Sequence, residues 1–218
     1  MREFDPYPNY PSSTRVANRT ITNRIAASYR DREFYDGDRM NGFGGMKNDG
    51  RWAAVADSLI KAYSLTNESN VLQIGCHKGF LLDEFLKRGI SVWGVESSAY
   101  AISQAPYPVQ TFLRKAPFTR IPFGTREMDL VISLNTVYNH TLADAIKCLK
   151  EIKRVGKGKS FITLGTYETE AEYFLLRKWF LFSGVVLTRP EWLEVLNHVG
   201  YEGDYRFEDA KYLGLVNG

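Results

Sequence analysis

The sequence has few of the residues that build covalent cross-links or metal sites. It contains two cysteines, Cys76 and Cys148, and three histidines among its 218 residues. Two cysteines do not make a disulfide framework, and no group of cysteines and histidines has metal-ligand spacing. We therefore expect neither structural disulfides nor a metal-dependent mechanism.

Long hydrophobic runs and a strong charge imbalance are also lacking. The most hydrophobic stretch, residues 173–187, is interrupted by Arg177 and Lys178 and is too short to span a bilayer. The first residues, MREFDPYPNYPSS, are polar and proline-rich, unlike a signal peptide. The net charge of +3 gives no argument for nucleic acid. We expect a cytoplasmic protein that binds neither a membrane nor a nucleic acid.

The sequence does contain enough apolar material for one ordinary core. Hydrophobic residues make up 44% of the chain, and 218 residues suit one domain with an extension. Residues 1–50 are predicted to form an N-terminal arm and a lid, and residues 51–218 the main domain. Glycine and aromatic residues mark the lid, which includes Tyr35, Phe43 and Met46; a surface loop is the alternative.

A strand, a glycine turn and a helix are predicted over residues 70–86. The apolar run at 71–74 is typical of a central parallel strand, and the turn at 75–79 precedes an apolar helix stripe. Such a turn lets a ligand approach the backbone and presents helix N-terminal N–H groups. Glu96 ends the next predicted strand about 20 residues later, where an acid accepts hydrogen bonds from ribose hydroxyls. This pattern predicts a cofactor that contains a nucleoside.

The turn resembles motif I of the class I S-adenosylmethionine-dependent methyltransferases, acid-x-Gly-x-Gly-x-Gly. The matching positions here are Gln73, Gly75, His77 and Gly79, so an amide replaces the acid and histidine replaces the middle glycine. Histidine tolerates a positive φ better than most residues. A nicotinamide-dependent oxidoreductase fits less well, because His77 and Phe80 replace two glycines of its fingerprint. A non-catalytic domain of the same fold is the other alternative.

The resemblance implies an α/β fold with a Rossmann-like, mostly parallel, seven-stranded sheet. Helices cover both faces, and the last strand is antiparallel. Residues 121–133, with Ile-Pro-Phe and Met-Asp-Leu-Val, resemble the family's next signature and its fourth strand. Further strands are expected at 109–113, 160–164, 201–207 and 212–216. Helices are expected at 20–32, 51–63, 99–104, 141–152, 168–182 and 190–199.

Polar residues after the fourth strand are expected at the methyl acceptor, because ligands of open α/β sheets bind outside the carboxyl ends of the strands. His140 is the candidate general base, with Tyr138 and Asn135 orienting the acceptor. A helix-capping or structural histidine is the alternative for His140. The helix at 168–182 has a wide apolar face, which suits a core, a homodimer interface or an acceptor pocket.

The remaining site residues follow from the resemblance. The family acid that bonds adenine is missing after residues 109–113, so backbone near Lys115 and Ala116 is expected to hold adenine. The expected cofactor-binding residues are Gly75, Cys76, His77, Gly79, Phe80, Glu96, Ser97, Ala116, Asn135 and Arg51. The expected substrate or lid residues are Tyr35, Phe43, Met46, Asn139 and Tyr167.

The expected activity is S-adenosylmethionine-dependent methylation of a small molecule. The glycine–aromatic stretch that ends in Asp-Gly-Arg-Trp at residues 49–52 resembles methyltransferases from bacterial surface-polysaccharide gene clusters. That resemblance implies O-methylation of a sugar or nucleotide-sugar in polysaccharide biosynthesis. Another small metabolite is the second choice of acceptor, and nucleic acid is the third.

Overall fold

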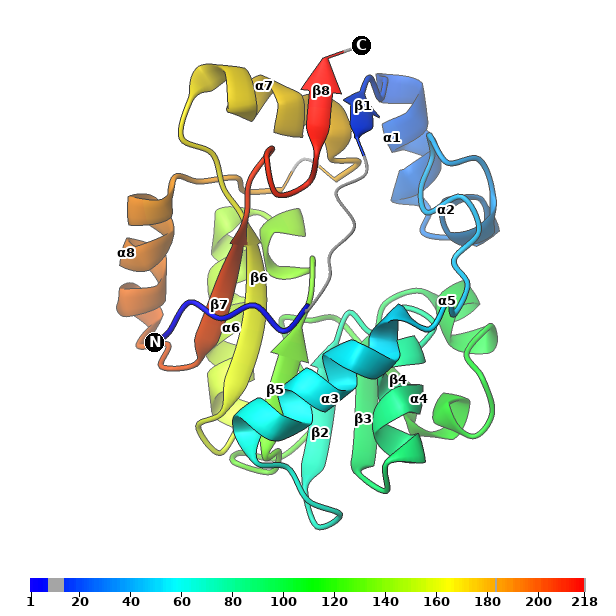
Figure 1. Ribbon diagram of the computed structural model, residues 1–218, viewed down its shortest axis with the longest axis vertical. Coiled ribbons are helices and arrows are strands. Elements are labelled where there is room, and N and C mark those ends of the chain that lie inside the picture. Colours follow the sequence, from blue (N-terminus) through cyan, green and yellow to red (C-terminus); the bar gives the residue numbers. More distant parts are fainter. Residues whose placement is uncertain (8–13, 183, 218) are drawn as a thin grey trace.

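The computed structural model describes residues 1–7, 14–182 and 184–217 (Figure 1). Its main sheet has six parallel strands in the order β4-β3-β2-β5-β6-β7. These strands are β2 (Asn70–Ile74), β3 (Ser91–Glu96), β4 (Leu113–Lys115), β5 (Leu130–Ser133), β6 (Ser160–Gly165) and β7 (Asp204–Glu208). The strand order reverses between β2 and β5, and a ligand of such a sheet binds at that switch point.

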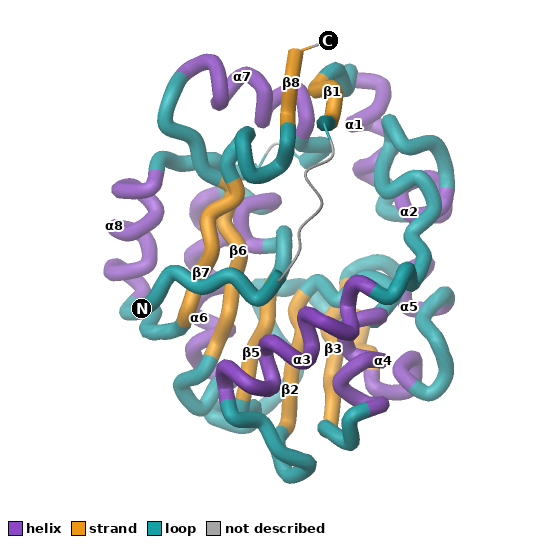
Figure 2. The backbone as a smooth tube through the Cα atoms, in the orientation of Figure 1, coloured by secondary structure: helices purple, strands orange, loops and turns teal. Residues whose placement is uncertain are grey.

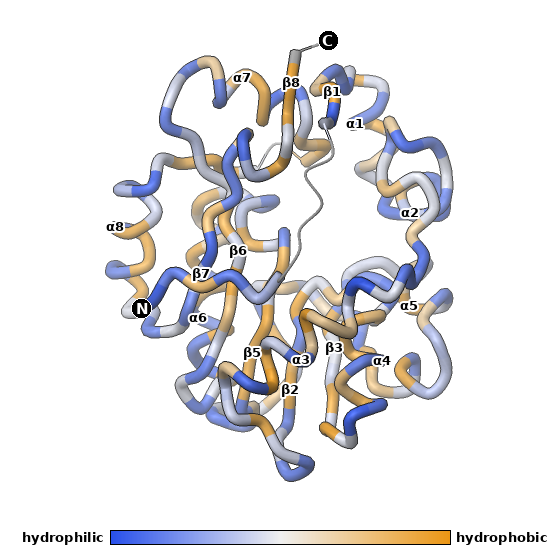
Figure 3. The backbone as a smooth tube through the Cα atoms, in the orientation of Figure 1, coloured by the Kyte–Doolittle hydropathy of each residue, from blue (hydrophilic) through white to orange (hydrophobic). Residues whose placement is uncertain are grey.

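Helices cover both faces of the sheet and bury two apolar cores. Helices α3 (Arg51–Tyr63) and α4 (Phe80–Lys87) pack on one face, and α6 (Leu142–Val155) and α8 (Arg189–Val199) on the other. The short α5 (Ala99–Ser103) follows β3. In Figure 3, hydrophobic residues are concentrated in β2, β5 and β6, whereas hydrophobic and hydrophilic residues alternate along α8. The predicted Rossmann-like α/β class is confirmed, but the main sheet of the described residues has six strands in place of the seven expected.

A second group of elements lies beyond the carboxyl ends of the strands (Figures 1 and 2). It contains a small parallel sheet and three helices. These elements are β1 (Arg15–Ala17), β8 (Leu215–Asn217), α1 (Ile21–Ser28), α2 (Arg32–Asp36) and α7 (Glu170–Trp179). We call this group the cap. Helix α2 of the cap carries Tyr35, so the fold places this part of the predicted lid at the ligand-binding end of the sheet.

Helix boundaries follow local capping chemistry. Thr141 begins α6, and its Oγ1 accepts a hydrogen bond from the Asp144 N–H at 3.2 Å. Thr188 and Glu191 form a capping box at the start of α8, with Pro190 in the first turn. These caps fix where the two helices that cover one face of the sheet begin.

The prediction of an antiparallel last strand is wrong. β7 pairs parallel with β6, and β8 leaves the main sheet to pair parallel with β1. The N-terminal segment covers the outer edge of β7, where Glu3 forms a bridge with Tyr205. The backbone N–H and C=O groups of Tyr205 on that edge are therefore hydrogen-bonded to residues from the other end of the chain.

Two other local predictions differ from the structure. Residues 109–113 form the 3₁₀-helix η1 (Val109–Phe112) before β4, because the N–H groups of Gln110 and Thr111 bond back to the carbonyls of Pro106 and Pro108. The helix expected at residues 20–32 is shorter in the structure, because α1 ends at Ser28, and Ile21 and Ile25 on it are largely exposed to solvent. Residues 8–13 of the predicted arm lie outside the described residues.

Candidate functional site

The glycine turn after β2 lies against the segment that follows β5. Gly75 and Gly79 have φ values of 69° and 73°, and His77 between them has a φ of 53°. A Cβ atom at Gly75 would lie 2.1 Å from Thr136 Oγ1, so a larger residue does not fit. The predicted turn thus forms at the switch point of the sheet.

Glu96 is the carboxylate around which this turn is built. Its side chain is 1% exposed and accepts hydrogen bonds from the N–H groups of His77 (2.9 Å), Ser97 (2.8 Å) and Ser98 (2.9 Å). These charge-assisted bonds orient both carboxylate oxygens. The Ser97 hydroxyl also donates to Oε1 at 3.3 Å, whereas Oε2 accepts the His77 N–H and, with a second acceptor position, retains capacity for a ribose hydroxyl. The residues present therefore fit the predicted nucleoside cofactor.

The predicted lid lies directly over the turn. Tyr35 is fully buried, and its hydroxyl oxygen is 3.4 Å from His77 Nδ1. The rings of Phe43 and His77 meet edge to face, with 5.1 Å between their centroids, and Met46 packs in the same cluster as Tyr35. Burial, and then the charge of Glu96, raise the pKa of Tyr35, so this hydroxyl stays protonated. The aromatic residues of the segment predicted as a lid therefore pack against the turn.

A buried ion pair fastens the lid to the turn. Lys78 Nζ lies 2.6 and 2.7 Å from the two carboxylate oxygens of Asp36 and donates to the Met46 carbonyl at 3.1 Å. The Tyr100 hydroxyl also donates to Asp36, at 2.7 Å. This pair could not be predicted, because nothing in a one-dimensional pattern joins residues 36 and 78.

Asp36→Asn is expected to loosen the lid, because it removes the negative charge that pairs with the buried Lys78 ammonium and leaves that ammonium with neutral oxygen partners only. Loss of a charged hydrogen-bond partner at a buried site costs about 1.5–3 kcal/mol. Hydrogen exchange of the amides in residues 32–46 should therefore become at least tenfold faster. Asp49→Asn removes an exposed ion pair with Arg51 and is the matched control. Equal exchange in both variants would contradict the anchoring role.

The other predicted cofactor residues occupy different surroundings. Burial raises the pKa of the Cys76 thiol, so it stays protonated. Phe80 is the first residue of α4, and the Ala116 N–H donates to the Glu96 carbonyl at 3.3 Å. Arg51 is largely exposed and paired with Asp49. Arg51 therefore has to leave that pair to reach a cofactor.

The predicted acceptor residues converge on a carboxylate that the sequence analysis missed. The Asn135 amide nitrogen lies 2.6 Å from Glu208 Oε2 in the orientation that satisfies both groups. The Tyr138 hydroxyl donates to the same oxygen at 3.3 Å. Glu208 itself forms a buried ion pair with Arg206, which Asp5 from the N-terminal arm also contacts at 2.8 Å. Glu208 thus orients two residues at the carboxyl end of the sheet.

His140 follows these residues and is half-buried. Its ring packs edge to face on Phe118, with 5.6 Å between the centroids, and its Nε2 has no partner among the described residues. Burial lowers the pKa of His140, and the positive charge of Arg30 lowers it further. Because Thr141 caps α6, His140 is not the capping residue. A neutral imidazole with an unused nitrogen is suited to accept a proton.

Two further predicted substrate residues flank this region. Asn139 Nδ2 donates to the Asn135 carbonyl at 2.5 Å, so it stabilises the turn after β5. Tyr167 packs against Tyr173 on α7, with 5.0 Å between the ring centroids. Tyr167 therefore belongs to the contact between the sheet and the cap.

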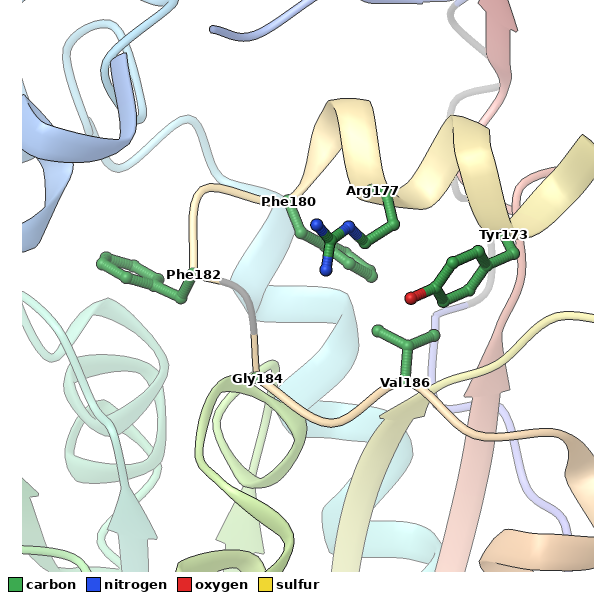
Figure 4. Close-up of a pocket in the computed structure, with 6 residues that line it drawn as sticks. All are labelled: Tyr173, Arg177, Phe180, Phe182, Gly184 and Val186. Carbon is green, nitrogen blue, oxygen red and sulfur yellow. The ribbon is translucent and has the colours of Figure 1, made fainter. Parts of the chain in front are cut away.

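A hollow opens beside the acceptor residues, between α7 and the loop that follows it (Figure 4). Its lining consists of Tyr173, Arg177, Phe180, Phe182, Gly184 and Val186. In Figure 4 the Arg177 guanidinium and the Tyr173 hydroxyl both point toward the space above Val186. Phe180 also packs on Tyr138, with 5.1 Å between ring centroids. The helix that carries this hollow thus combines core residues with a partly polar surface pocket.

Two other features of the described residues bear on the class of site. No three histidine, cysteine, aspartate or glutamate residues among them gather as a metal site would require. Within the same residues, none of the helices has the length and apolar character needed to cross a membrane.

Comparison with known proteins gives one family match. Residues 72–164 match the family described as "Methyltransferase domain". The match begins in β2 and ends in β6, so it contains the glycine turn, Glu96 and the residues after β5. No curated protein matches the sequence.

Solved structures share the fold at low sequence identity. The YcgJ protein from Bacillus subtilis is 16% identical, with a TM-score of 0.55 over 66% of each chain. A chain from the complex of the Haloferax volcanii Trm112 methyltransferase activator with a methyltransferase is 19% identical, with a TM-score of 0.53. That alignment covers 70% of this chain and 73% of the other.

The chain spans less of some longer structures. The alignment covers 40% of a methyltransferase from an antibiotic biosynthesis pathway of Anabaena variabilis and 47% of this chain, with 20% identity and a TM-score of 0.43. The family match and the shared fold together support a class I methyltransferase and indicate S-adenosylmethionine as its cofactor.

Proposed function

We propose that the protein transfers the methyl group of S-adenosylmethionine to an oxygen of a sugar or nucleotide-sugar in surface polysaccharide biosynthesis. The observation that carries the methyl-transfer part is the closure of an aromatic lid over the glycine turn and Glu96. The sugar acceptor is inferred from the resemblance of the glycine–aromatic stretch at residues 34–52. The bound cofactor supplies an electrophilic methyl group on a sulfonium.

The residues of this chain supply orientation, water exclusion and a proton acceptor. Glu96 and the turn amides hold the nucleoside, and α2 has to open for it because Tyr35 covers this place. The apolar lid then keeps water from the reacting groups. His140 takes the proton of the acceptor hydroxyl as that oxygen attacks. Glu208 holds Asn135 and Tyr138 in place on the acceptor side.

A transfer assay tests this proposal directly. The enzyme is incubated with methyl-labelled S-adenosylmethionine and a panel of nucleotide-sugars, free sugars and short nucleic acids. We expect alkali-stable label in a nucleotide-sugar, as an O-methyl ether, and none in nucleic acid. A Glu96→Gln sample serves as the background control. Label in nucleic acid alone, or in none of the free sugars and nucleotide-sugars, would contradict the proposed acceptor class.

A further inference from the structure

Arg30 stands out as a strained residue whose position is fixed from two sides. It joins α1 to α2 with a φ of 49°, in the left-handed region that favours glycine. Its N–H donates to the Ala27 carbonyl at 3.0 Å, and its own carbonyl accepts from Ser98 Oγ at 2.6 Å. Ser98 also bonds Glu96 through its N–H. Ser98 therefore links the backbone of Arg30 to the Glu96 carboxylate. Backbone strain of the kind seen at Arg30 is concentrated at functional sites.

The guanidinium of Arg30 lies between the two halves of the site. Its central carbon is 4.2 Å from the centroid of the Phe182 ring. Its charge contributes to lowering the pKa of both His77 in the turn and His140 beside the acceptor residues. Among the described residues, the guanidinium takes part in no hydrogen bond or ion pair. Within the part of the chain that the structure describes, it is a half-buried cation without a counter-ion, between the glycine turn and the residues that follow β5.

The nearby carboxylates are committed to other partners. Glu96 accepts three backbone N–H groups, and Asp36 is held by Lys78 and Tyr100. Asp144 pairs with Lys147 on the outer face of α6. A half-buried cation without a partner is unfavourable, and an anion supplied by a ligand removes that penalty.

We propose that Arg30 binds an anionic group of the methyl acceptor, a phosphate or a carboxylate. This inference rests on the proposed function and narrows the acceptor from a neutral sugar to one that carries an anionic group. The planar guanidinium matches the oxygen pair of a phosphate or carboxylate. Phe182 supports Arg30 and also lines the hollow into which Arg177 points, so an extended anion meets a second cation there.

The three histidines of the chain provide a direct readout, since two of them lie beside Arg30 and His198 lies exposed on α8. Inorganic pyrophosphate, compared with chloride at equal ionic strength, is titrated against the histidine proton resonances. We expect it to raise the pKa values of His77 and His140 by about half a unit or more. His198 resonances serve as the internal reference. Absence of any pyrophosphate effect in the native protein would overturn the inference.

Variants assign the effect to Arg30. Arg30→Gln should raise both histidine pKa values without ligand and abolish the response to pyrophosphate. Arg30→Lys retains the charge, so the histidine pKa values should stay low, but pyrophosphate should bind at least tenfold more weakly. Arg32→Gln removes an exposed charge two residues away and should behave like the native protein. A full pyrophosphate response in Arg30→Gln would assign the anion to another residue and overturn the inference.

A second experiment distinguishes an acceptor site from the cofactor site, because the cofactor also carries a carboxylate that could bind Arg30. The titration is repeated with the protein saturated with S-adenosylhomocysteine. A pyrophosphate response that persists supports an acceptor site. A response that disappears because S-adenosylhomocysteine itself neutralises Arg30 would overturn the inference while leaving the methyltransferase function intact. Failure of S-adenosylhomocysteine to bind at all would instead contradict the proposed function.

Discussion

Glu96→Gln should weaken S-adenosylhomocysteine binding about ten- to a hundredfold without unfolding the protein. The carboxylate is 1% exposed and is held by three backbone N–H groups, so it is already oriented for a ligand. A charged hydrogen bond is worth about 1.5–3 kcal/mol, and about 1.4 kcal/mol corresponds to a tenfold change in affinity. One ribose hydroxyl on this carboxylate therefore accounts for about a ten- to hundredfold loss. Isothermal titration calorimetry measures it.

The choice of glutamine separates binding from folding. Glu96→Ala would leave the N–H groups of His77, Ser97 and Ser98 without their acceptor, whereas glutamine keeps one side-chain oxygen. Glu68→Gln makes the same change at an exposed position and is the matched control. Unchanged affinity in Glu96→Gln, in a protein with native thermal stability, would contradict the cofactor site.

His140→Ala should reduce turnover by about 10²–10⁴-fold, the range that general-base catalysis contributes. Its affinity for S-adenosylhomocysteine should stay within about threefold of the native value, because His140 lies with the acceptor residues and not in the turn. The imidazole has an unused nitrogen, and Thr141 performs the capping of α6. His198→Ala, on the exposed face of α8, is the matched control for loss of a histidine.

The pH dependence of turnover gives a second test of His140. Burial and the positive charge of Arg30 place the pKa of His140 below its ordinary value of 6.5. The base form therefore predominates at neutral pH, and turnover should be flat above about pH 7. Turnover should fall only as the pH drops below about 6.5, because the imidazole then takes up a proton. Native turnover in His140→Ala, with the same acid limb, would show that the histidine is structural.

The parts of the fold that follow local rules could be predicted from the sequence. The helix predicted at residues 51–63 has those bounds, and the strand, turn and acid of residues 70–96 lie where the pattern places them. Hydrophobic periodicity and glycine positions carry this information within one segment. The last strands could not be predicted, because β8 pairs with β1 across nearly the whole chain length.

The same distinction holds within the candidate site. Glu96 and the turn could be placed from their spacing, which is a sequence signal, whereas the lid, inferred from aromatic and glycine content, stays a prediction. Lys78, Glu208 and Arg30 were not, because each acquires its role from a partner far away in the sequence. In the sequence, Arg177 is a charge that interrupts an apolar run, and its place at a pocket is seen only in the structure.

The central claim is that Glu96 and the glycine turn hold a sulfur nucleoside for methyl transfer. The most direct measurement titrates the native protein and Glu96→Gln with S-adenosylmethionine, S-adenosylhomocysteine and NAD by calorimetry. We predict micromolar binding of both sulfur nucleosides to the native protein, its loss in the variant, and no binding of NAD. Binding of NAD instead, or of none of the three ligands, would contradict a methyltransferase built around this site.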